Sequence, residues 1–304
     1  MKIFLTGATG YIGGSVAARL IGDGHAVRGL VRSETRADQV REHGLEPVIG
    51  SLDDAAVLTA AAGEADAVIN AASADHTGAV EAILSGLAGS GKAFVHTSGS
   101  SIVGTRAGGE AVDDIYEDDT PLTPSPARAA RVALNETIVA AAGRGVRTAI
   151  IAPSLIYGLG RGVERHSMQV PWLIALARKS GVARHVGPGG NIWSNVHIDD
   201  LVELYALALE KAPAGAFYYA ENGEHSMREV CVAISRMLGQ GGRTEAMSLD
   251  EAAGEWGEGP ANDTMGSNSR VRAVRARQEL GWSPAAPSLI EEIERGCYAA
   301  GTVG

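Results

Sequence analysis

The chain has 304 residues, of which 45% are hydrophobic and 20% charged, an ordinary composition for a soluble globular protein large enough to bury a sizeable core. Its formal net charge of −10 argues against nucleic acid or an anionic membrane surface as a partner. The sequence contains two cysteines far apart and no cluster of metal ligands, and it leaves no room for a signal peptide or a membrane span. We therefore expect a cytoplasmic protein without a metal.

The most informative segment is at the N-terminus. An apolar strand, residues 3–6, leads into a turn in which Gly7, Gly10 and Gly13 follow the spacing GxxGxxG, and an amphipathic helix follows. Gly7 suits a tight turn, Gly10 lets the backbone approach a pyrophosphate, and Gly13 lets the helix pack closely on the strand. The helix N-terminus offers N–H groups to phosphates. This context predicts a dinucleotide site, and the alternative is a purely structural turn.

Strands and helices alternate through the first half. Further apolar strands are expected at residues 26–31, 46–49, 67–71, 93–97 and 148–151, with alanine-rich helices between them. The alternation predicts an α/β fold with a doubly wound parallel sheet of the Rossmann type, covered by helices on both faces. Ligands of such sheets bind at the carboxyl ends of the strands. We assign residues 1–152 to this dinucleotide-binding domain.

The pattern changes after residue 152. Loops rich in Gly, Pro, His and Trp dominate, and helices are expected at residues 199–211, 227–238, 249–254 and 288–298. We expect residues 153–304 to form a smaller, irregular, mainly substrate-binding part that covers the mouth of the sheet. Some of its elements should return to the Rossmann core.

Several short motifs together resemble the extended short-chain dehydrogenase/reductase superfamily, of the NAD-dependent epimerase/dehydratase kind. They occur in the expected order over nearly the whole chain. The motifs are TGATGYIG at residues 6–13, GSLD at 50–53, NAA at 70–72, HTSG at 96–99, PSLIYG at 153–158, VHIDDL at 196–201 and ELGWSP at 279–284.

The resemblance implies a set of cofactor-binding residues. The glycine turn would wrap the pyrophosphate, two residues after the third strand would flank the adenine, and the loops after the fourth, fifth and sixth strands would line the ribose and the nicotinamide. These residues are Gly7, Thr9, Gly10, Tyr11, Ile12, Gly13, Ser51, Leu52, Ala71, Ala72, Ser73, Ser98, Pro153 and Ile156.

The end of the second strand indicates which dinucleotide is bound. An acidic residue there binds the ribose 2′-OH of NAD, whereas an arginine accommodates the 2′-phosphate of NADP. The strand is followed by Arg32 and Ser33, with Arg36 close behind, and no acid stands at its end. A guanidinium matches a phosphate in geometry and charge. We therefore expect NADP(H), the alternative being that Arg32 is a solvated surface residue.

The chain departs from the superfamily at the catalytic pair. The family's chemistry uses a tyrosine and a lysine spaced YxxxK on one helix, because the lysine lowers the pKa of the phenol that transfers the proton. Aligning Glu136 with the family's glutamate places Arg128 and Val132 at the tyrosine and lysine positions. The usual Ser or Thr of the fifth-strand loop falls at Gly99.

Three interpretations follow from this departure: an NADP(H)-dependent reductase or dehydrogenase with a different proton donor, a non-catalytic NADP(H) sensor, or a non-redox lyase or isomerase. For the first, Arg128 could stabilise a developing oxyanion, Ser98 or Ser100 could donate hydrogen bonds, and Tyr157 or His197 could act as acids. Each has a structural alternative. Tyr157 could be a packing aromatic, His197 a buried residue beside a helix start, and Arg128 a solvated residue.

The second part should supply the substrate pocket. The residues expected there, together with Ser100, are His166, Met168, Gln169, Trp193 and Asn195. Their apolar side chains suggest a small, partly apolar organic substrate, although they could equally be core residues. A nucleotide-sugar epimerase is the weaker alternative, because only Arg270 or Arg272 could meet a diphosphate. By analogy with the superfamily, helices at residues 77–87 and 128–142 would pair into a homodimer.

Overall fold

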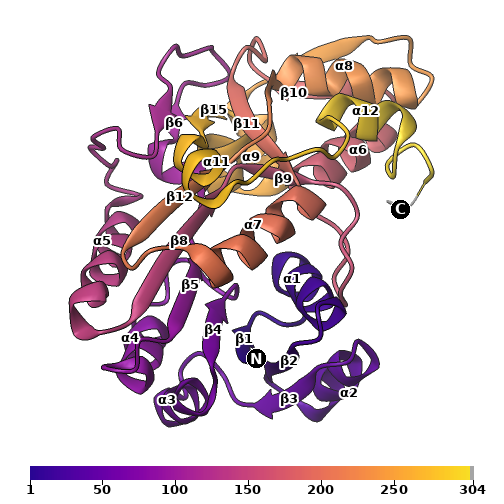
Figure 1. Ribbon diagram of the computed structural model, residues 1–304. Helices are drawn as coiled ribbons and strands as arrows, with labels where there is room; N and C mark the ends of the chain where they lie inside the picture. Colours follow the sequence, from indigo (N-terminus) through magenta and orange to yellow (C-terminus); the bar gives the residue numbers. More distant parts are fainter. Residues whose placement is uncertain (302–304) are drawn as a thin grey trace.

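The computed structural model describes residues 1–301 and is built around one seven-stranded parallel sheet (Figure 1). The strand order is β12-β8-β5-β4-β1-β2-β3, and every neighbouring pair is parallel. The strands are β1 (Lys2–Thr6), β2 (Ala26–Val31), β3 (Glu46–Ile49), β4 (Ala67–Asn70), β5 (Ala93–Thr97), β8 (Arg147–Pro153) and β12 (Ala216–Ala220). The predicted doubly wound Rossmann sheet is confirmed.

Alternate residues of the central strands point to opposite faces of the sheet and pack into two separate hydrophobic cores. In β1, Ile3 and Leu5 join the core on one face, whereas Phe4 joins the core on the other, as the period of two in a strand requires. Both faces are therefore covered by helices. On the Phe4 face lie α3 (Ala55–Glu64), α4 (Thr77–Leu87) and α5 (Ala129–Ala140), and on the opposite face lie α1 (Tyr11–Gly22), α2 (Glu34–Glu42), α7 (Ile198–Lys211) and α11 (Val274–Leu280).

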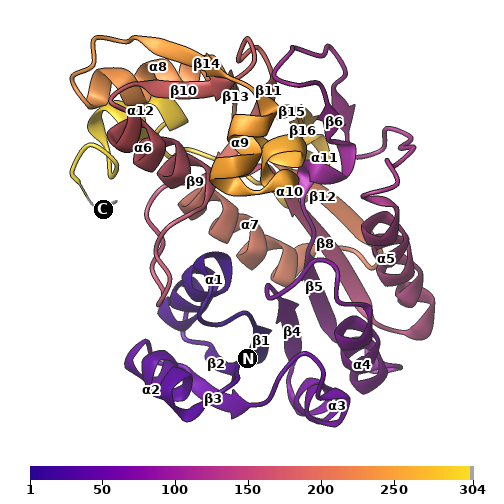
Figure 2. The ribbon, with the colours of Figure 1, turned by 180° about the vertical axis from the view of Figure 1, so that it is seen from behind.

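The second half of the chain forms a smaller layer over one end of the sheet (Figure 2). It contains a three-stranded sheet and a strand pair, enclosed by short helices. The strands are β9 (Leu155–Tyr157), β11 (Ile192–His197), β13 (Glu224–Ser226), β10 (Ala183–Val186) and β14 (Thr244–Met247). The helices are α6 (Gln169–Ser180), α8 (Met227–Met237), α9 (Leu249–Trp256), α10 (Glu258–Pro260), η3 (Ala261–Met265) and α12 (Leu289–Arg295).

Local sequence explains where several of these helices start. Ser226, Ser248 and Ser288 each accept a hydrogen bond from the backbone N–H three residues on, and a glutamate at that third position bonds back to the serine N–H. These reciprocal capping boxes satisfy two N–H groups that a helix start otherwise leaves without partners. They fix α8, α9 and α12, for which the sequence predicted helices.

Short segments join the two halves. They connect the stretch between β5 and α5 to the C-terminal third of the chain. The pairs are β6 (Thr105–Arg106) with β15 (Ser267–Asn268) and β7 (Tyr116–Glu117) with β16 (Val271–Arg272), and the 3₁₀ turns η1 (Ser100–Val103) and η2 (Ala141–Arg144) flank α5. Within residues 1–301 no helix is long and apolar enough to cross a membrane.

The second half also returns to the large sheet. β12 adds the seventh strand beside β8, and α7 packs Leu201 and Tyr205 on the sheet face that contains Ile3 and Leu5. The strand order reverses between β1 and β4, since the chain winds outward from β1 to β3 and then in the opposite direction from β4 to β12. This switch point opens a crevice at the carboxyl ends of β1 and β4, beneath the second layer.

Candidate functional site

The glycine turn between β1 and α1 has no room for side chains. Gly7 has a φ of +76°, in the left-handed region, and a Cβ there would lie 2.5 Å from the carbonyl oxygen of Ala71. A Cβ on Gly13 would lie 2.2 Å from the carbonyl oxygen of Gly7. No side chain within residues 1–301 caps α1, whose N-cap is Gly10, so its first N–H groups are open to an anion.

A hollow of about 460 Å³ opens beside this turn, and we call it the glycine-loop hollow. It runs from the end of β1 across the ends of β2 and β3 and reaches the loop after β4. Its walls are Gly7, Thr9, Gly10, Leu30, Val31, Arg32, Arg36, Gly50, Ser51, Leu52, Asp53, Ala71, Ala72 and His76. The hollow thus brings together nine residues predicted to bind the cofactor.

Two arginines stand at the β2 end of the glycine-loop hollow. Arg32 directly follows β2, and within residues 1–301 its guanidinium has no hydrogen-bond or ion-pair partner. Arg36 lies in the first turn of α2, where Ser33 accepts a hydrogen bond from its backbone N–H, and its Nη1 donates to Oε1 of Gln39 at 2.9 Å. Ser33 is therefore the N-cap of α2, and both arginines offer N–H groups to the hollow.

The opposite wall contains a linked pair that the sequence did not single out. The imidazole of His76 accepts from the N–H of Ala79 at the start of α4 and lies 3.1 Å from Oδ1 of Asp53. This contact joins the loops after β3 and β4. It places one acid in the hollow, on the β3 side rather than at the end of β2.

The remaining predicted cofactor residues lie around the hollow without lining it. Tyr11 donates its phenol O–H to the carbonyl of Gly158 at 2.9 Å, and Ile12 packs on the core beside it. Ser73 accepts a hydrogen bond from the N–H of Asp75 in the loop after β4. Pro153 ends β8, and half-buried Ile156 lies in β9.

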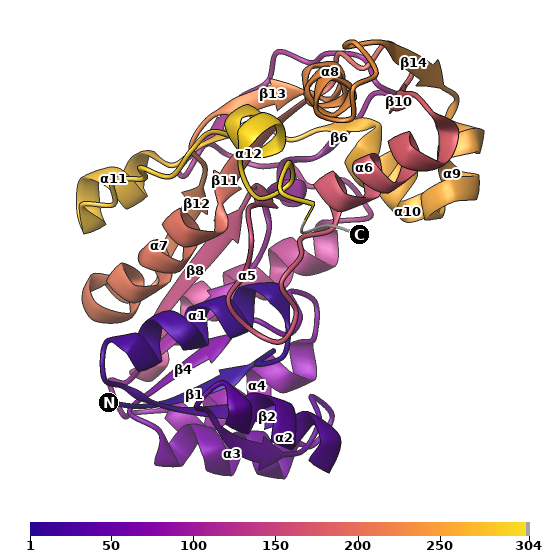
Figure 3. The same ribbon diagram turned by 90° about the vertical axis from the view of Figure 1, so that its right-hand side faces the viewer.

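The loop between β9 and α6 descends from the second layer to the start of α1, as Figure 3 shows. The N–H of Glu164 donates to the carbonyl of Thr9, and the N–H of Arg161 donates to the hydroxyl of Ser15. Gly162 touches Gly14 so closely that a Cβ on Gly162 would lie 2.5 Å from the other Cα. The second half is thereby fastened to the glycine turn itself.

Arg128 and Asp263 meet at the beginning of α5. Arg128 is the N-cap of the helix, its side chain is largely buried, and its Nη2 lies 4.0 Å from Oδ2 of Asp263. The same carboxylate accepts two hydrogen bonds from Arg106, at 2.6 and 2.9 Å. The hydrogen bonds from Arg106 hold the pKa of Asp263 below its usual range, and the charge of Arg128 contributes. Arg128 thus places a largely buried positive charge at the helix start.

One turn further along α5, Arg131 reaches back to the loop after β4. Its Nε and Nη2 donate to the two carboxylate oxygens of Asp75 at 2.7 and 2.5 Å, and its Nη1 donates to Ser101 at 3.1 Å. The hydrogen bonds from Arg131 hold the pKa of Asp75 below its usual range. This clamp joins the loops after β4 and β5, and sequence reasoning missed it.

The two candidate serines after β5 differ in availability. Ser98 is buried, and its Oγ accepts from Nδ2 of Asn135, so its own hydroxyl hydrogen remains available. Ser100 is fully buried, and its Oγ lies 2.8 Å from that of Ser269, which donates to the carbonyl of Ser100. Ser100 therefore joins the two halves of the chain and lines neither the glycine-loop hollow nor the hollow beside η1, so its place in a substrate pocket stays a prediction.

Tyr157 and His197 pack against each other and make hydrogen bonds within the fold. Tyr157 is fully buried, and its hydroxyl donates to the carbonyl of Pro287. His197 caps α7 by accepting from the N–H of Asp199, and its Nε2 lies 3.8 Å from Glu292. The two rings meet edge to face, with centroids 5.3 Å apart. These contacts agree with the structural alternative for both residues, and the acid roles stay a prediction.

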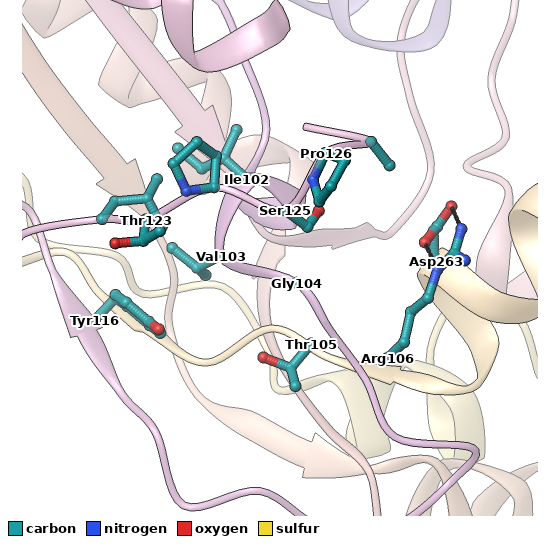
Figure 4. Close-up of a pocket in the computed structure, with 13 residues that line it drawn as sticks. Ile102, Val103, Gly104, Thr105, Arg106, Tyr116, Thr123, Ser125, Pro126 and Asp263 are labelled. Carbon is teal, nitrogen blue, oxygen red and sulfur yellow. Dashed lines mark hydrogen bonds and ion pairs between the residues drawn. The ribbon is translucent and has the colours of Figure 1, made fainter. Parts of the chain in front are cut away.

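A second hollow, of about 480 Å³, lies beside η1 and the start of α5, and we call it the η1 hollow (Figure 4). Most of its walls are apolar, and the ion pair between Arg106 and Asp263 stands at one side. The lining residues are Ile102, Val103, Gly104, Thr105, Arg106, Tyr116, Leu122, Thr123, Pro124, Ser125, Pro126, Ala127 and Asp263. None was predicted, because a hollow assembled from loops carries no short motif.

The substrate residues predicted in the second part do not line either hollow. Trp193 is buried and donates its indole N–H to the carbonyl of Ser267, and Asn195 is buried with its amide 3.1 Å from the imidazole of His225. The other three lie before or at the start of α6: half-buried His166, exposed Met168 and half-buried Gln169. For the two buried residues the core alternative is the better description.

The arginines considered for a diphosphate are also engaged. Arg270 donates to Glu224 at 2.7 and 3.1 Å, and Arg272 donates to the same carboxylate at 3.0 Å. These hydrogen bonds lower the pKa of Glu224 to about 2. Both guanidinium groups thus link β13 to β16 and the residue before it. Because both are already paired with Glu224, the nucleotide-sugar interpretation, which needs them for a diphosphate, is weakened.

Comparisons with known proteins agree with this geometry. The family model described as "NAD dependent epimerase/dehydratase family" matches residues 3–219. The chain is 34% identical to an oxidase, ucsJ, from Acremonium over 96% of this chain and 95% of the relative. It is 30% identical to a 2-alkyl-3-oxoalkanoate reductase from Stenotrophomonas maltophilia over 83% and 80% of the two chains.

Solved structures show the same fold. A dTDP-glucose 4,6-dehydratase from Bacillus anthracis, in complex with NAD, superimposes with a TM-score of 0.79 and 16% identity over 99% of this chain and 97% of that one. The glycine turn, the seven-stranded sheet and the family-model match over more than two thirds of the sequence point to one assignment. The chain belongs to the NAD dependent epimerase/dehydratase family.

Proposed function

We propose that this protein is an NADP(H)-dependent reductase that acts on the carbonyl group of a small, partly apolar organic molecule. The observation that carries the proposal is the glycine-loop hollow, in which a phosphate cradle lies beside the guanidinium groups of Arg32 and Arg36. Similarity to relatives named as an oxidase, a ketoreductase and a reductase supports redox chemistry.

The residues present fit a dinucleotide with a 2′-phosphate. A Cβ at Gly7 or Gly13 would meet backbone atoms within 2.5 Å, so the turn is kept bare for a close approach to a pyrophosphate. Arg32 has no partner within residues 1–301, so a phosphate oxygen could receive its N–H groups without breaking an existing bond. A bound NADPH would supply a hydride at its nicotinamide ring, which is the cofactor's own chemistry.

The chain's own contribution at the reacting end would come from Ser98 and Arg128. The Ser98 hydroxyl keeps a free hydrogen, because its Oγ already accepts from Asn135 and the hydroxyl donates to no acceptor within residues 1–301. That hydrogen could bond the substrate oxygen. Arg128, largely buried at the start of α5, would stabilise negative charge developing on this oxygen. The proton that completes the alcohol would come from water, since no tyrosine–lysine pair is present.

The η1 hollow would hold the apolar part of the substrate. It adjoins η1, which follows the Ser98 loop, and the start of α5, which carries Arg128. Its walls come from Ile102, Val103 and Leu122 among others, so burial of an alkyl or aromatic group there would be favourable. The ion pair between Arg106 and Asp263 forms the charged side of this hollow.

The proposal is tested by incubating the purified protein with NADPH and a panel of ketones, enones and imines while NADPH absorbance is followed. Consumption of NADPH with formation of an alcohol from a ketone or from the carbonyl of an enone would support the carbonyl reductase, whereas an amine from an imine or a saturated ketone from an enone would contradict the carbonyl assignment. Binding of NADPH without turnover on any compound would favour the sensor interpretation. Conversion of a compound without net consumption of NADPH would favour a lyase or isomerase.

A further inference from the structure

We infer that Arg131, clamped by Asp75, is the cation that holds the nicotinamide-side half of the dinucleotide, a role that no sequence motif indicates. The inference rests on the proposed function and adds a positioning residue to it. It starts from the guanidinium itself. Nε and Nη2 of Arg131 donate to both carboxylate oxygens of Asp75, so one edge of the planar group is fixed by a two-point contact.

The other edge of this guanidinium retains donor capacity. Arginine has five N–H donors, and Arg131 uses three of them: two toward Asp75 and one toward Ser101 at 3.1 Å. The side chain is 17% exposed, so the group is largely shielded by protein yet still accessible. An anchored cation with unused donors and limited solvent contact is suited to bind an oxygen of a ligand.

Gly99 lies beside this cation. Its φ of −171° is extended backbone that any residue adopts, so the glycine is not needed for the turn. A Cβ on Gly99 would lie 3.5 Å from Nη1 of Arg131 and 3.8 Å from the hydroxyl of Ser101. A serine or threonine, which the superfamily resemblance places here, would add a hydroxyl beside the same guanidinium. The two departures, Gly99 and the missing YxxxK pair, are therefore spatially linked to Arg131.

The location follows from the topology. Asp75 lies in the loop after β4, only a few residues beyond Ala71 and Ala72, which line the glycine-loop hollow. Gly99 follows β5, the next strand in the sheet. Since Arg32 and Arg36 mark the adenosine end at β2, an extended dinucleotide must continue past β1 and β4 toward β5, where Arg131 stands.

A neighbouring histidine indicates how close the charge lies to the end of β5. His96 is fully buried, and its Nδ1 lies 3.0 Å from the amide nitrogen of Asn70. Burial lowers its pKa to about 4, and the positive charge of Arg131 acts in the same direction. The guanidinium lies beside Gly99 and Ser101, just beyond the carboxyl end of β5.

The inference is tested by titration calorimetry with two probes. NADPH contains both halves of the dinucleotide, whereas 2′,5′-ADP contains only the adenosine half with its 2′-phosphate. Arg131→Met should weaken NADPH about 10- to 100-fold, the effect of losing a hydrogen bond to a charged group, and leave 2′,5′-ADP within about twofold. Arg131→Lys should restore part of the NADPH affinity, and Asp75→Asn should show a smaller loss of the same kind.

Arg144→Ala is the matched control, because it removes one exposed positive charge at the far end of the same helical segment. It should change neither affinity, and thermal unfolding should verify that each variant is folded. Unchanged NADPH affinity in Arg131→Met, or equal weakening of both probes, would overturn the inference while leaving the proposed function intact. Wild-type protein that binds neither probe would overturn both. If Arg131→Met does not fold, Asp75→Asn and Arg131→Lys decide by the same comparison of the two probes.

Discussion

The buried imidazole of His96 should make this protein lose stability in mild acid. His96 is fully buried on β5, and burial lowers its pKa to about 4 in the folded protein, against about 6.5 in the unfolded chain. The unfolded state therefore binds a proton that the folded state rejects. The sign follows directly: stability is complete above pH ~6.5 and falls as the pH drops toward the folded pKa.

The magnitude follows from the two pKa values. Between pH 7 and pH 5 the unfolded chain gains nearly one proton at this site while the folded protein gains almost none, which costs about 2 kcal/mol of unfolding free energy. His96→Asn keeps an acceptor for the amide of Asn70 but removes the titration. The variant should be less stable at neutral pH, because it leaves a cavity, and should lack this share of the acid sensitivity.

Urea unfolding of both proteins at pH 8, 7, 6 and 5 measures the effect, with the two higher values as the internal control. The stability difference between wild type and His96→Asn should be constant from pH 8 to 7 and should shrink by about 2 kcal/mol by pH 5. A difference that stays constant down to pH 5 would refute the account. The imidazole would then be protonated in the folded protein, in contradiction to its burial.

Three further predictions concern the cofactor, the descending loop and assembly. Arg32→Ala should weaken NADPH about tenfold or more and leave NADH unchanged in calorimetry, because only NADPH carries the 2′-phosphate; equal loss for both would contradict this role. Gly162→Ala, whose Cβ would meet Gly14, should cost about 1–3 kcal/mol in urea unfolding, and an unchanged midpoint would refute the close contact. If α4 and α5 pair across a two-fold axis, light scattering of the wild-type protein should give the mass of a dimer. Ala133 lies on the exposed face of α5, so Ala133→Glu should reduce this mass to that of a monomer. A monomeric wild type would refute the pairing.

The strands of the first half could be predicted because each is a short apolar run bounded by loops or glycines. The bounds of β2, β3 and β5 agree with the sequence prediction residue for residue. β12 and α6 were missed. β12 is a five-residue apolar run that becomes a strand by pairing with β8, more than sixty residues earlier, and local sequence does not encode that contact. Tertiary pairing, rather than propensity, decides such segments.

The site shows the same division. The glycine turn could be predicted because its requirement is local: backbone conformation and the absence of Cβ atoms. The clamp between Arg131 and Asp75 joins residues 56 positions apart, and Tyr157 finds its acceptor 130 positions away. Contacts between residues so far apart in the sequence produce no recognisable sequence motif. Sequence reasoning therefore identified the glycine turn, and it could not foresee the distant partners that Tyr157 and His197 contact in the fold.

Titration of the purified protein with NADPH and with NADH, side by side in a calorimeter, tests the central claim most directly. The account predicts tight binding of NADPH and binding of NADH at least about tenfold weaker, because the 2′-phosphate meets Arg32 and Arg36 in the glycine-loop hollow. Equal affinity for both dinucleotides would contradict the NADP(H) assignment. Absence of binding by either would contradict the proposed reductase as a whole.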